Sequence, residues 1–306
     1  MEIIIPQPDK SLLLKELTPE RFVRHTNFGK NEIYIFNSNN SPNLMQEVGR
    51  LRELSFRMAG GGTGKSVDID QYDLGSKPFE QLIVWNPVNQ EIVGGYRFVL
   101  MKKLGVDSSG KVKTPTSKLF YLSQKFKSDY LPFTIELGRS FVQPDYQPSK
   151  NPRIGIYSLD NLWDGLGAII KLNPEVKYYF GKITMYPKTD LLAREAVMYF
   201  LGKFFPDKER LAYPINAVNL KTDVAFFENL FNKDSYAENY KILQQFVRKQ
   251  YANIPPLVNA YMNLSLTMKT FGTTINSTFG NVEETGIMIT ISDIHPEKKE
   301  RHLTGM

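Results

Sequence analysis

Charged residues in apolar surroundings are the part of this sequence best suited to do chemistry. Arg97 and Arg139 both stand in strand-like apolar segments, where a charge is costly unless it is paired or used. The charges fall in four groups along the chain: Arg52-x-x-x-Phe56, Asp68-x-Asp70-x-x-Asp73, Gly94-Gly95-Tyr96-Arg97 and Glu136-Leu137-Gly138-Arg139-Ser140-Phe141-Val142. These groups alternate with segments typical of helix, loop, strand and strand. A fold of that kind can bring the charged side chains to one cleft.

Glu136 is the candidate general base. The chain has no cysteine, which excludes disulfides, zinc–cysteine sites, iron–sulfur clusters and a cysteine nucleophile. It has three histidines, His25, His295 and His302, near the two ends of the sequence. A histidine-rich metal site or a Ser-His-Asp triad is therefore not expected, and no metal ion is assigned. A carboxylate is the side chain expected to move protons.

The strand around Gly138 decides how Glu136 and Arg139 can act together. In a regular strand these two side chains would point to opposite faces. A β-bulge at Gly138 would bring both to one face and expose backbone N–H groups. That arrangement suits acyl transfer, in which Glu136 takes a proton from an attacking amine and an N–H holds the developing oxyanion. The alternative is a structural Glu–Arg pair that braces the bulge.

The acidic loop that begins at Asp68 has several interpretations. Its spacing could supply oxygen ligands for calcium, but it lacks the glycine and the final glutamate of an EF-hand loop. It could instead bind a cationic substrate group or cap its own backbone. Ion pairs with Arg52 and Arg97 are favoured, because both arginines lie in apolar surroundings and need partners.

The segment 59–66 matches a relaxed phosphate-loop pattern, with alanine in place of the first glycine. A true phosphate loop runs from a buried strand into a helix. Here the segment follows a helix-like stretch and precedes an acidic, non-helical one. A flexible loop is therefore predicted, and a nucleotide-binding module stays as an alternative of another class.

The hydrophobic pattern predicts an α+β protein. Helical spacing covers residues 44–58, 157–172, 190–205, 225–250 and 257–271. Strand-like patterns cover 79–85, 92–102, 133–142, 178–186, 273–279 and 287–291. No repeat or linker divides the chain, so we expect a single domain over 1–306, with 206–306 as a C-terminal elaboration.

The net charge of +6 and the pI near 9.1 leave the partner open. A solvated basic surface is one explanation, and attraction to an acidic protein or anionic lipid is another. Nucleic acid is the weakest partner, because no signature of nucleic-acid binding is present. Without a signal peptide or a spanning stretch, the protein is expected in the cytoplasm, with peripheral contact at the inner membrane. A non-catalytic membrane-surface protein that uses the helix at 257–271 is a further alternative.

The four groups together resemble the acyl-homoserine-lactone synthases and, more closely, the N-acyl amino acid synthases that make ornithine- or glycine-containing lipids. Chains of that kind often carry the label hemolysin. The resemblance extends from about residue 50 to 291. It also includes these stretches: Leu162-Trp163-x-Gly165, Phe180-Gly181-Lys182-Ile183-Thr184 and Ile254-Pro255-Pro256-Leu257.

The resemblance implies a Gcn5-related N-acetyltransferase (GNAT) fold, with a central mixed twisted β-sheet flanked by helices. It implies transfer of a fatty acyl group to an amino-acid amine such as that of glycine or ornithine, for aminolipid synthesis. The donor is an acyl-phosphopantetheine thioester on acyl carrier protein or coenzyme A, and no cofactor is bound permanently. The alternative product is an autoinducer lactone.

Residue by residue, the resemblance makes Glu136 and Arg139 catalytic. The residues implied to bind substrate are Arg52, Phe56, Asp70, Asp73, Arg97, Ser140, Phe141 and Trp163. The loop between the strand at 133–142 and the helix at 157–172 would cradle the pantetheine arm. The sequence after this strand lacks the Arg/Gln-x-x-Gly-x-Gly motif that binds the pyrophosphate of coenzyme A, which favours a carrier-protein donor. The tryptophan expected before the acidic loop of lactone synthases is also absent.

Overall fold

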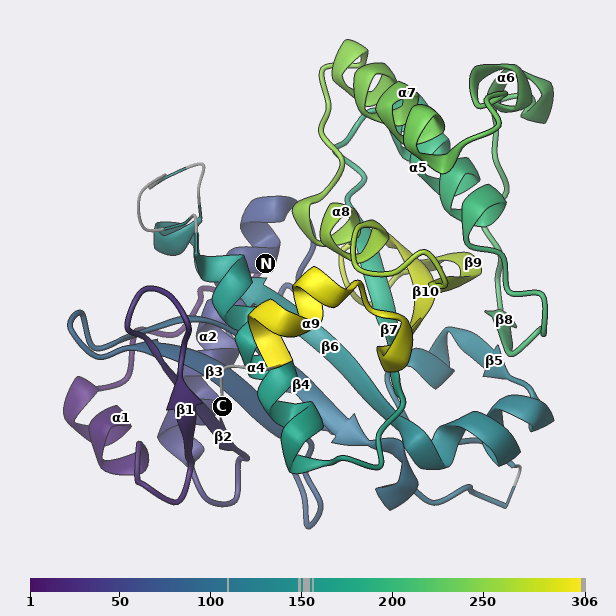
Figure 1. Ribbon diagram of the computed structural model, residues 1–306. Coiled ribbons are helices and arrows are strands. Elements are labelled where there is room, and N and C mark those ends of the chain that lie inside the picture. The colour runs from purple at the N-terminus through teal and green to yellow at the C-terminus, as the bar shows by residue number, and fades with distance from the viewer. Residues whose placement is uncertain (109, 148–149, 151–154, 156, 304–306) are drawn as a thin grey trace. The chain divides into compact units, whose positions relative to one another are not determined.

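The computed structural model describes residues 1–108, 110–147, 150, 155 and 157–303 (Figure 1). The chain forms two compact units. The first unit comprises 1–103, 135–177 and 295–306, and the second comprises 104–134 and 178–294. Each unit is described by itself.

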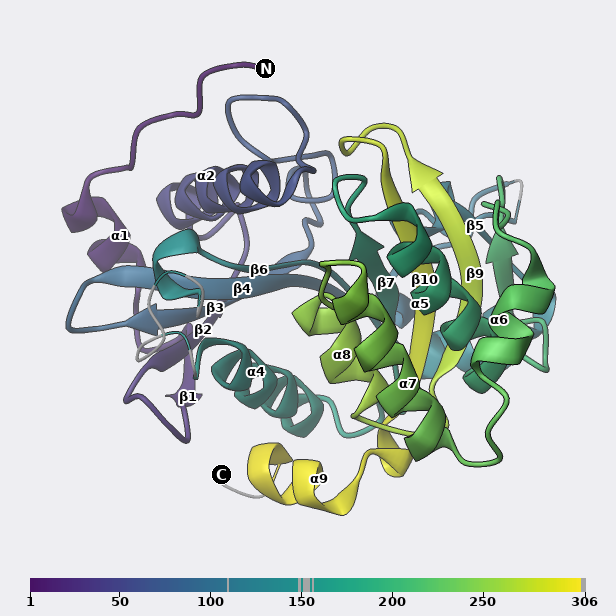
Figure 2. The ribbon, with the colours of Figure 1, turned by 90° about the horizontal axis from the view of Figure 1, so that it is seen from above.

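Five antiparallel strands form the sheet of the first unit, in the order β1-β2-β3-β4-β6. Their bounds are β1 Phe22–His25, β2 Glu32–Phe36, β3 Glu80–Asn86, β4 Glu91–Leu100 and β6 Thr134–Val142. The helices of this unit are α1 Lys10–Glu16, α2 Pro42–Ala59, α4 Ser158–Leu172 and α9 Pro296–Leu303. Figure 2 shows α2 on one side of these strands and α4 on the other.

Glycines allow α4 to pack closely against its neighbours. A Cβ atom at Gly165 would lie 2.6 Å from a methyl carbon of Leu82 in β3. At Gly167 it would lie 2.1 Å from the carbonyl oxygen of His302 in α9. Close packing against β3 and α9 therefore explains both glycines of this helix.

The second unit has two small antiparallel sheets and four helices. One sheet has the order β7-β10-β9 (Tyr178–Met185, Val282–Thr290 and Lys269–Asn276), and the other pairs β5 Phe120–Leu122 with β8 Ala212–Pro214. The helices are α5 Leu191–Phe204, α6 Val224–Leu230, α7 Tyr236–Lys249 and α8 Pro256–Met262. Short single turns occur in both units at Met101–Lys103, Thr116–Lys118, Phe126–Tyr130, Leu131–Phe133, Pro144–Tyr146 and Ile291–Asp293.

Aromatic side chains form much of the core between α5 and α7. The buried ring of Phe200 lies 4.5 Å from that of Phe204 and 5.6 Å from that of Tyr236, between ring centroids. Phe231 contacts Phe200 edge to face at 5.5 Å. Rings at these separations add to the hydrophobic stabilisation of the unit.

Most of the predicted elements are present. The single helical stretch predicted at 225–250 is divided into two helices, α6 and α7. The helix predicted at 257–271 is not formed, because α8 ends at Met262 and β9 begins at Lys269. That prediction was wrong, and with it the long apolar helix assigned to a membrane surface. None of the helices in the described ranges is both long and apolar enough to cross a bilayer.

Candidate active site

A β-bulge in β6 places the two predicted catalytic residues. Arg97 of β4 pairs with Gly138, and Gly95 pairs with Phe141, so a single residue of β4 faces both Arg139 and Ser140. Arg139 has φ +51°, a left-handed conformation that side chains other than glycine rarely adopt. The predicted bulge therefore exists, one residue after Gly138.

The bulge brings Glu136 and Arg139 to one face of the sheet. Glu136 pairs with Val99, two residues from Arg97, so Glu136 and Arg97 share a face. Arg97 contacts Asp70 at 2.7 Å, and Arg139 approaches the same carboxylate at 3.7 Å. Since both arginines reach Asp70, Arg139 lies on that face as well.

Two glycines of β4 let the bulged strand approach closely. A Cβ atom at Gly94 would lie 2.4 Å from the carbonyl oxygen of Phe141. A Cβ atom at Gly95 would lie 2.6 Å from that of Leu82. Gly138 differs, since no described atom would lie within 4 Å of a Cβ built there. Open space therefore borders the strand on the face that carries Glu136.

Arg97 is the centre of a buried ionic network. Its guanidinium donates to Asp70 at 2.7 Å and to Asp73 at 2.9 Å, and it lies over the ring of Tyr72, 5.6 Å from the centroid. The side chain is 2% exposed. Burial opposes its charge, but Asp73 and Asp70 outweigh burial and raise the pKa of Arg97 above its usual value.

Arg52 of α2 completes this network from the helix. It donates to Asp73 at 3.2 Å and also to the side-chain oxygen of Gln81 in β3. Gln81 in turn donates to Asp73 at 3.1 Å. Burial lowers the pKa of Arg52, and this outweighs the opposing effect of Asp73. The predicted pairing of the acidic loop with Arg52 and Arg97 is confirmed.

The two buried aspartates of the loop differ in their titration. Burial alone would raise the pKa of Asp73, but Arg52 and Arg97 outweigh it and lower that pKa to about 2. Asp68 forms an ion pair with Arg139 at 2.9 Å. Burial nevertheless raises the pKa of Asp68, against the effect of the nearby arginines. The network therefore fixes Asp73 as a carboxylate more firmly than Asp68.

Glu136 lies close to this network. It is 4% exposed on the face of the sheet that carries Arg97. Burial raises the pKa of Tyr72, and the negative charges of Glu136 and Asp70 raise it further. Glu136, Tyr72 and Asp70 are therefore neighbours in the folded chain.

Comparison with known proteins shows which family this chain resembles. The Acetyltransferase (GNAT) domain family matches residues 51–154, which contain all four charged groups. The glycine N(alpha)-acyltransferase of Phocaeicola vulgatus is 50% identical over 303 residues, 99% of this chain and 93% of that protein. A protein with the same name from Bacteroides thetaiotaomicron is 51% identical over 303 residues, 99% of this chain and 90% of that protein. No solved structure matches the chain.

The chain belongs to this family of N-acyltransferases. The predicted resemblance, the α+β GNAT-like fold and the acyltransferase activity are thereby confirmed. Enzymes of this kind take their acyl group from a thioester of the coenzyme A type. The site described above lies wholly within the part of the acyltransferase that matches the GNAT family.

The other predicted substrate residues of the acyltransferase fall on both faces of the sheet. Phe56 is buried one turn after Arg52 on α2, the helix that contacts the charged network. Ser140 and Phe141 follow Arg139 in β6. Trp163 lies on α4, on the opposite face, where α4 contacts Leu82. The structure thus does not bring Trp163 to the charged network, and its role in binding stays a prediction.

The glycine-rich loop of the acyltransferase holds a carboxylate of its own chain. Glu53 accepts from the backbone N–H groups of Thr63 at 2.9 Å and Gly64 at 2.7 Å. Arg57 also donates to it at 2.6 Å. In a phosphate loop such N–H groups would point at the ligand. Here they stabilise an acidic side chain, which favours the predicted loop over the alternative of a nucleotide site.

Two residues of the network were not predicted. Gln81 is fully buried between Arg52 and Asp73, and Tyr72 stacks on Arg97. The signal for Gln81 was a polar residue at the start of the otherwise apolar strand β3.

Much of the predicted pantetheine loop, including 151–154, lies outside the described residues. Within the ranges that the structure describes, no three or more acidic or histidine side chains could hold a metal ion.

Proposed function

We propose that this acyltransferase moves a fatty acyl group from acyl carrier protein to the amine of glycine. The product is an N-acylglycine for aminolipid synthesis. Support comes from the relatives, which are named for acylation of glycine and are 50% and 51% identical over 99% of this chain. The observation that carries the proposal is the bulge, which gathers Glu136, Arg139 and Asp70 on one face beside open space.

The acceptor binds through the charges that solvent can reach. The side chains of Arg52 and Arg97 are 0% and 2% exposed, whereas that of Arg139 is 17% exposed. The Asp70 side chain is 31% exposed and lies 3.7 Å from Arg139. In the proposal, Arg139 pairs with the carboxylate of glycine and Asp70 with its ammonium group. The buried arginines hold Asp70 and Asp73 in place.

Glu136 then acts as the base. It takes a proton from the ammonium group, directly or through a water molecule, and the freed amine attacks the thioester carbonyl. A backbone N–H of the bulged strand stabilises the oxyanion. The carbon–sulfur bond breaks as the amide forms, and the thiol leaves with a proton. The products are N-acylglycine, the carrier thiol and one proton.

An acidic carrier protein suits the charge of the enzyme. The net charge is +6, and a basic surface attracts an acidic partner and speeds its association. Coenzyme A is the alternative carrier of the same acyl-phosphopantetheine group. Because the product is amphiphilic, the proposal includes peripheral contact with the inner membrane. Sedimentation with anionic vesicles tests that contact.

The proposed reaction is tested by direct product analysis. Purified enzyme is incubated with palmitoyl carrier protein, or with palmitoyl coenzyme A, and a mixture of amino acids that includes glycine, alanine and ornithine. Mass spectrometry should detect N-palmitoylglycine as the main product, and faster with the carrier protein. A predominance of acylated ornithine or alanine, or no acylated product, would contradict the proposal.

A further inference from the structure

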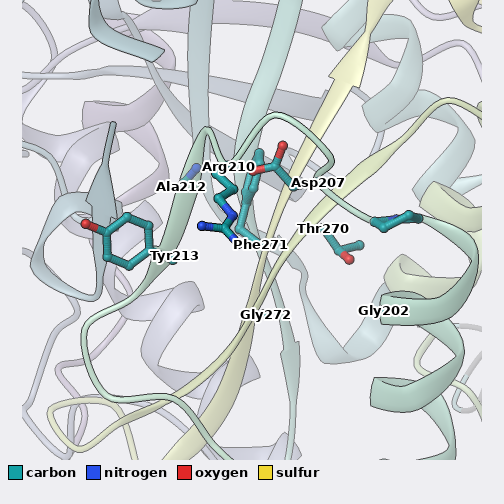
Figure 3. Close-up of a pocket in the computed structure, with 9 residues that line it drawn as sticks. Gly202, Asp207, Arg210, Ala212, Tyr213, Thr270, Phe271 and Gly272 are labelled. Atoms are coloured by element: carbon teal, nitrogen blue, oxygen red, sulfur yellow. Dashed lines mark hydrogen bonds between the residues drawn. The ribbon is translucent and has the colours of Figure 1, made fainter. Parts of the chain in front are cut away.

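A cavity of about 660 Å³ lies within the second unit (Figure 3). Its wall includes Gly202 at the end of α5, Arg210 and Tyr213 around β8, and Phe271 in β9. Small-molecule sites commonly have volumes of about 300–1,000 Å³. None of the residues implied by the family resemblance contributes to this wall.

Arg210 supplies a positive charge to the cavity. In Figure 3 its guanidinium extends into the space between Tyr213 and Thr270. Within the described part of the chain this guanidinium forms no hydrogen bond or ion pair. Arg210 has φ +52°, a strained backbone conformation for a residue with a side chain. Arg210 is exposed and lines the cavity, so its guanidinium is available to a ligand.

Asp207 holds the loop that carries Arg210. Its carboxylate accepts from the backbone N–H groups of Glu209 at 3.2 Å, Leu211 at 2.5 Å and Ala212 at 3.3 Å. These donors offset the negative charge of Asp207, so Arg210 remains the cation that a ligand meets.

Gly202 keeps the cavity open. It stands within α5, where a glycine costs about 1 kcal/mol relative to alanine. No described atom would lie within 4 Å of a Cβ at this position, and no left-handed backbone conformation requires glycine there. Gly202 is exposed and borders the cavity, so a side chain at this position would extend into open space at the cavity.

The rest of the wall is largely apolar. Phe271 and Ala212 are 3% and 4% exposed. The ring of Tyr213 lies 5.3 Å from that of Tyr121. An apolar surface with one available guanidinium fits a molecule that has an aliphatic chain and a single anionic group.

We propose that this cavity binds an aliphatic carboxylate, with its head on Arg210 and its chain against Phe271 and Ala212. The ligand could be a free fatty acid or an N-acylated amino acid, because both carry a carboxylate and an acyl chain. The inference goes beyond the proposed function and does not depend on catalysis by the enzyme.

Isothermal titration with laurate and with N-lauroylglycine, on the full-length protein, tests the site. The Gly202→Leu variant fills the cavity from a helical position that favours leucine, so the fold is retained. Its affinity for the ligand should be at least about tenfold weaker than that of the wild type. Arg210→Gln should lower the affinity for laurate by about tenfold, because a charge-assisted hydrogen bond is lost, and should lower the affinity for dodecanol much less.

Lys208→Gln is the matched control, because Lys208 is an exposed neighbouring cation that does not line the cavity. It should bind laurate as the wild type does. Tighter binding of N-lauroylglycine than of laurate would identify the acylated amino acid as the ligand, and the reverse would identify the free acid. No binding to the wild type, or equal binding to Gly202→Leu, would overturn the inference. Acyl transfer is assayed separately, so the proposed function can fail without affecting this result.

Discussion

Glu136 and Gly138 lie two positions apart on the same face of β6 and differ in their surroundings. Glu136 is 4% exposed, whereas a side chain at Gly138 would extend into open space on the same face. In the proposed mechanism Glu136 takes a proton from an amine that occupies the open space beside Gly138.

Gly138→Val tests whether that space receives the acceptor. Nothing described lies within 4 Å of the added Cβ, and valine favours a strand, so the melting temperature should not fall. The branched side chain should occupy the space for glycine and lower kcat/KM for glycine by about tenfold or more, mainly through KM. Gly95→Ala is the contrasting variant, because its Cβ would lie 2.6 Å from a backbone oxygen and should destabilise the protein. An unchanged kcat/KM in Gly138→Val would show that glycine does not bind in the space beside Gly138.

Asp73→Asn tests the ionic network through stability. The variant leaves Arg52 and Arg97 buried with one charge fewer between them, so it should lose about 3–5 kcal/mol of unfolding free energy at pH 7. The folded-state pKa of Asp73 is lowered to about 2, so its contribution is present above the unfolded value near 4 and is lost as the pH falls toward 2.

The difference in stability between wild type and Asp73→Asn should therefore shrink between pH 4 and pH 2. Urea denaturation across this range measures it. A difference that is constant or grows at low pH would show that Asp73 is not held as a carboxylate. Asp68→Asn is the comparison, because the pKa of Asp68 is raised by burial, and its variant should not show this loss at low pH.

The bulge in β6 is the element that creates the site. Without the extra residue, Arg139 would point away from Asp70, and the charged groups would be divided between two faces. The left-handed conformation of Arg139 is the cost of that arrangement, about 1–2 kcal/mol for a side-chain residue.

Arg139→Gly and Arg139→Ala separate the backbone from the guanidinium. Both lose the ion pair with Asp68, but only glycine adopts φ +51° without strain. The glycine variant should be the more stable by about 1 kcal/mol in urea denaturation, with both inactive on glycine at ordinary concentrations. Equal stability, or a more stable alanine variant, would mean that the bulge is not strained at Arg139.

The sequence predicts these elements unevenly, for physical reasons. Apolar residues at helical or alternating spacing predicted α2, β3, β4 and β6, because burial on one face imposes that spacing. The bulge was predicted next to its true place, since Gly138 and Arg139 are adjacent and only the strand register separates them. The helix predicted at 257–271 failed because the chain turns after Met262, where Leu264 donates to the Tyr261 carbonyl and Met268 to that of Ser265, and β9 begins at Lys269.

Long-range contacts limit how much of the site could be predicted from the sequence. The pairing of the acidic loop with Arg52 and Arg97 followed from the cost of a buried charge, so it could be predicted. Gln81 could not be placed, because its partners come from α2 and from the acidic loop. The cavity beside Arg210 depends on three distant segments and has no motif in the sequence.

At the scale of the whole molecule, the two units carry different features. The first unit holds the charged network, and the second holds the cavity with Arg210. The net charge of +6 belongs to the entire chain, and its proposed purpose is to attract an acidic acyl donor.

The dependence of KM on ionic strength tests whether the positive charge of the enzyme attracts the acyl carrier protein. KM for an acyl carrier protein should rise several-fold between 50 mM and 500 mM salt, because screening weakens attraction between exposed charges. KM for glycine should change less, since Asp70 and Arg139 are partly buried. Steady-state kinetics with each substrate varied in turn measures both effects. A KM for the carrier protein that is independent of salt would contradict electrostatic recruitment.

The rate of N-acylglycine formation by Glu136→Gln is the most direct test of the mechanism. The substitution keeps the shape of the side chain and removes its ability to accept a proton, so kcat should fall by about 10²–10⁴-fold. The melting temperature and KM for glycine should stay close to those of the wild type. A Glu136→Gln enzyme that retains most of the wild-type kcat, with the fold intact, would show that Glu136 is not the base.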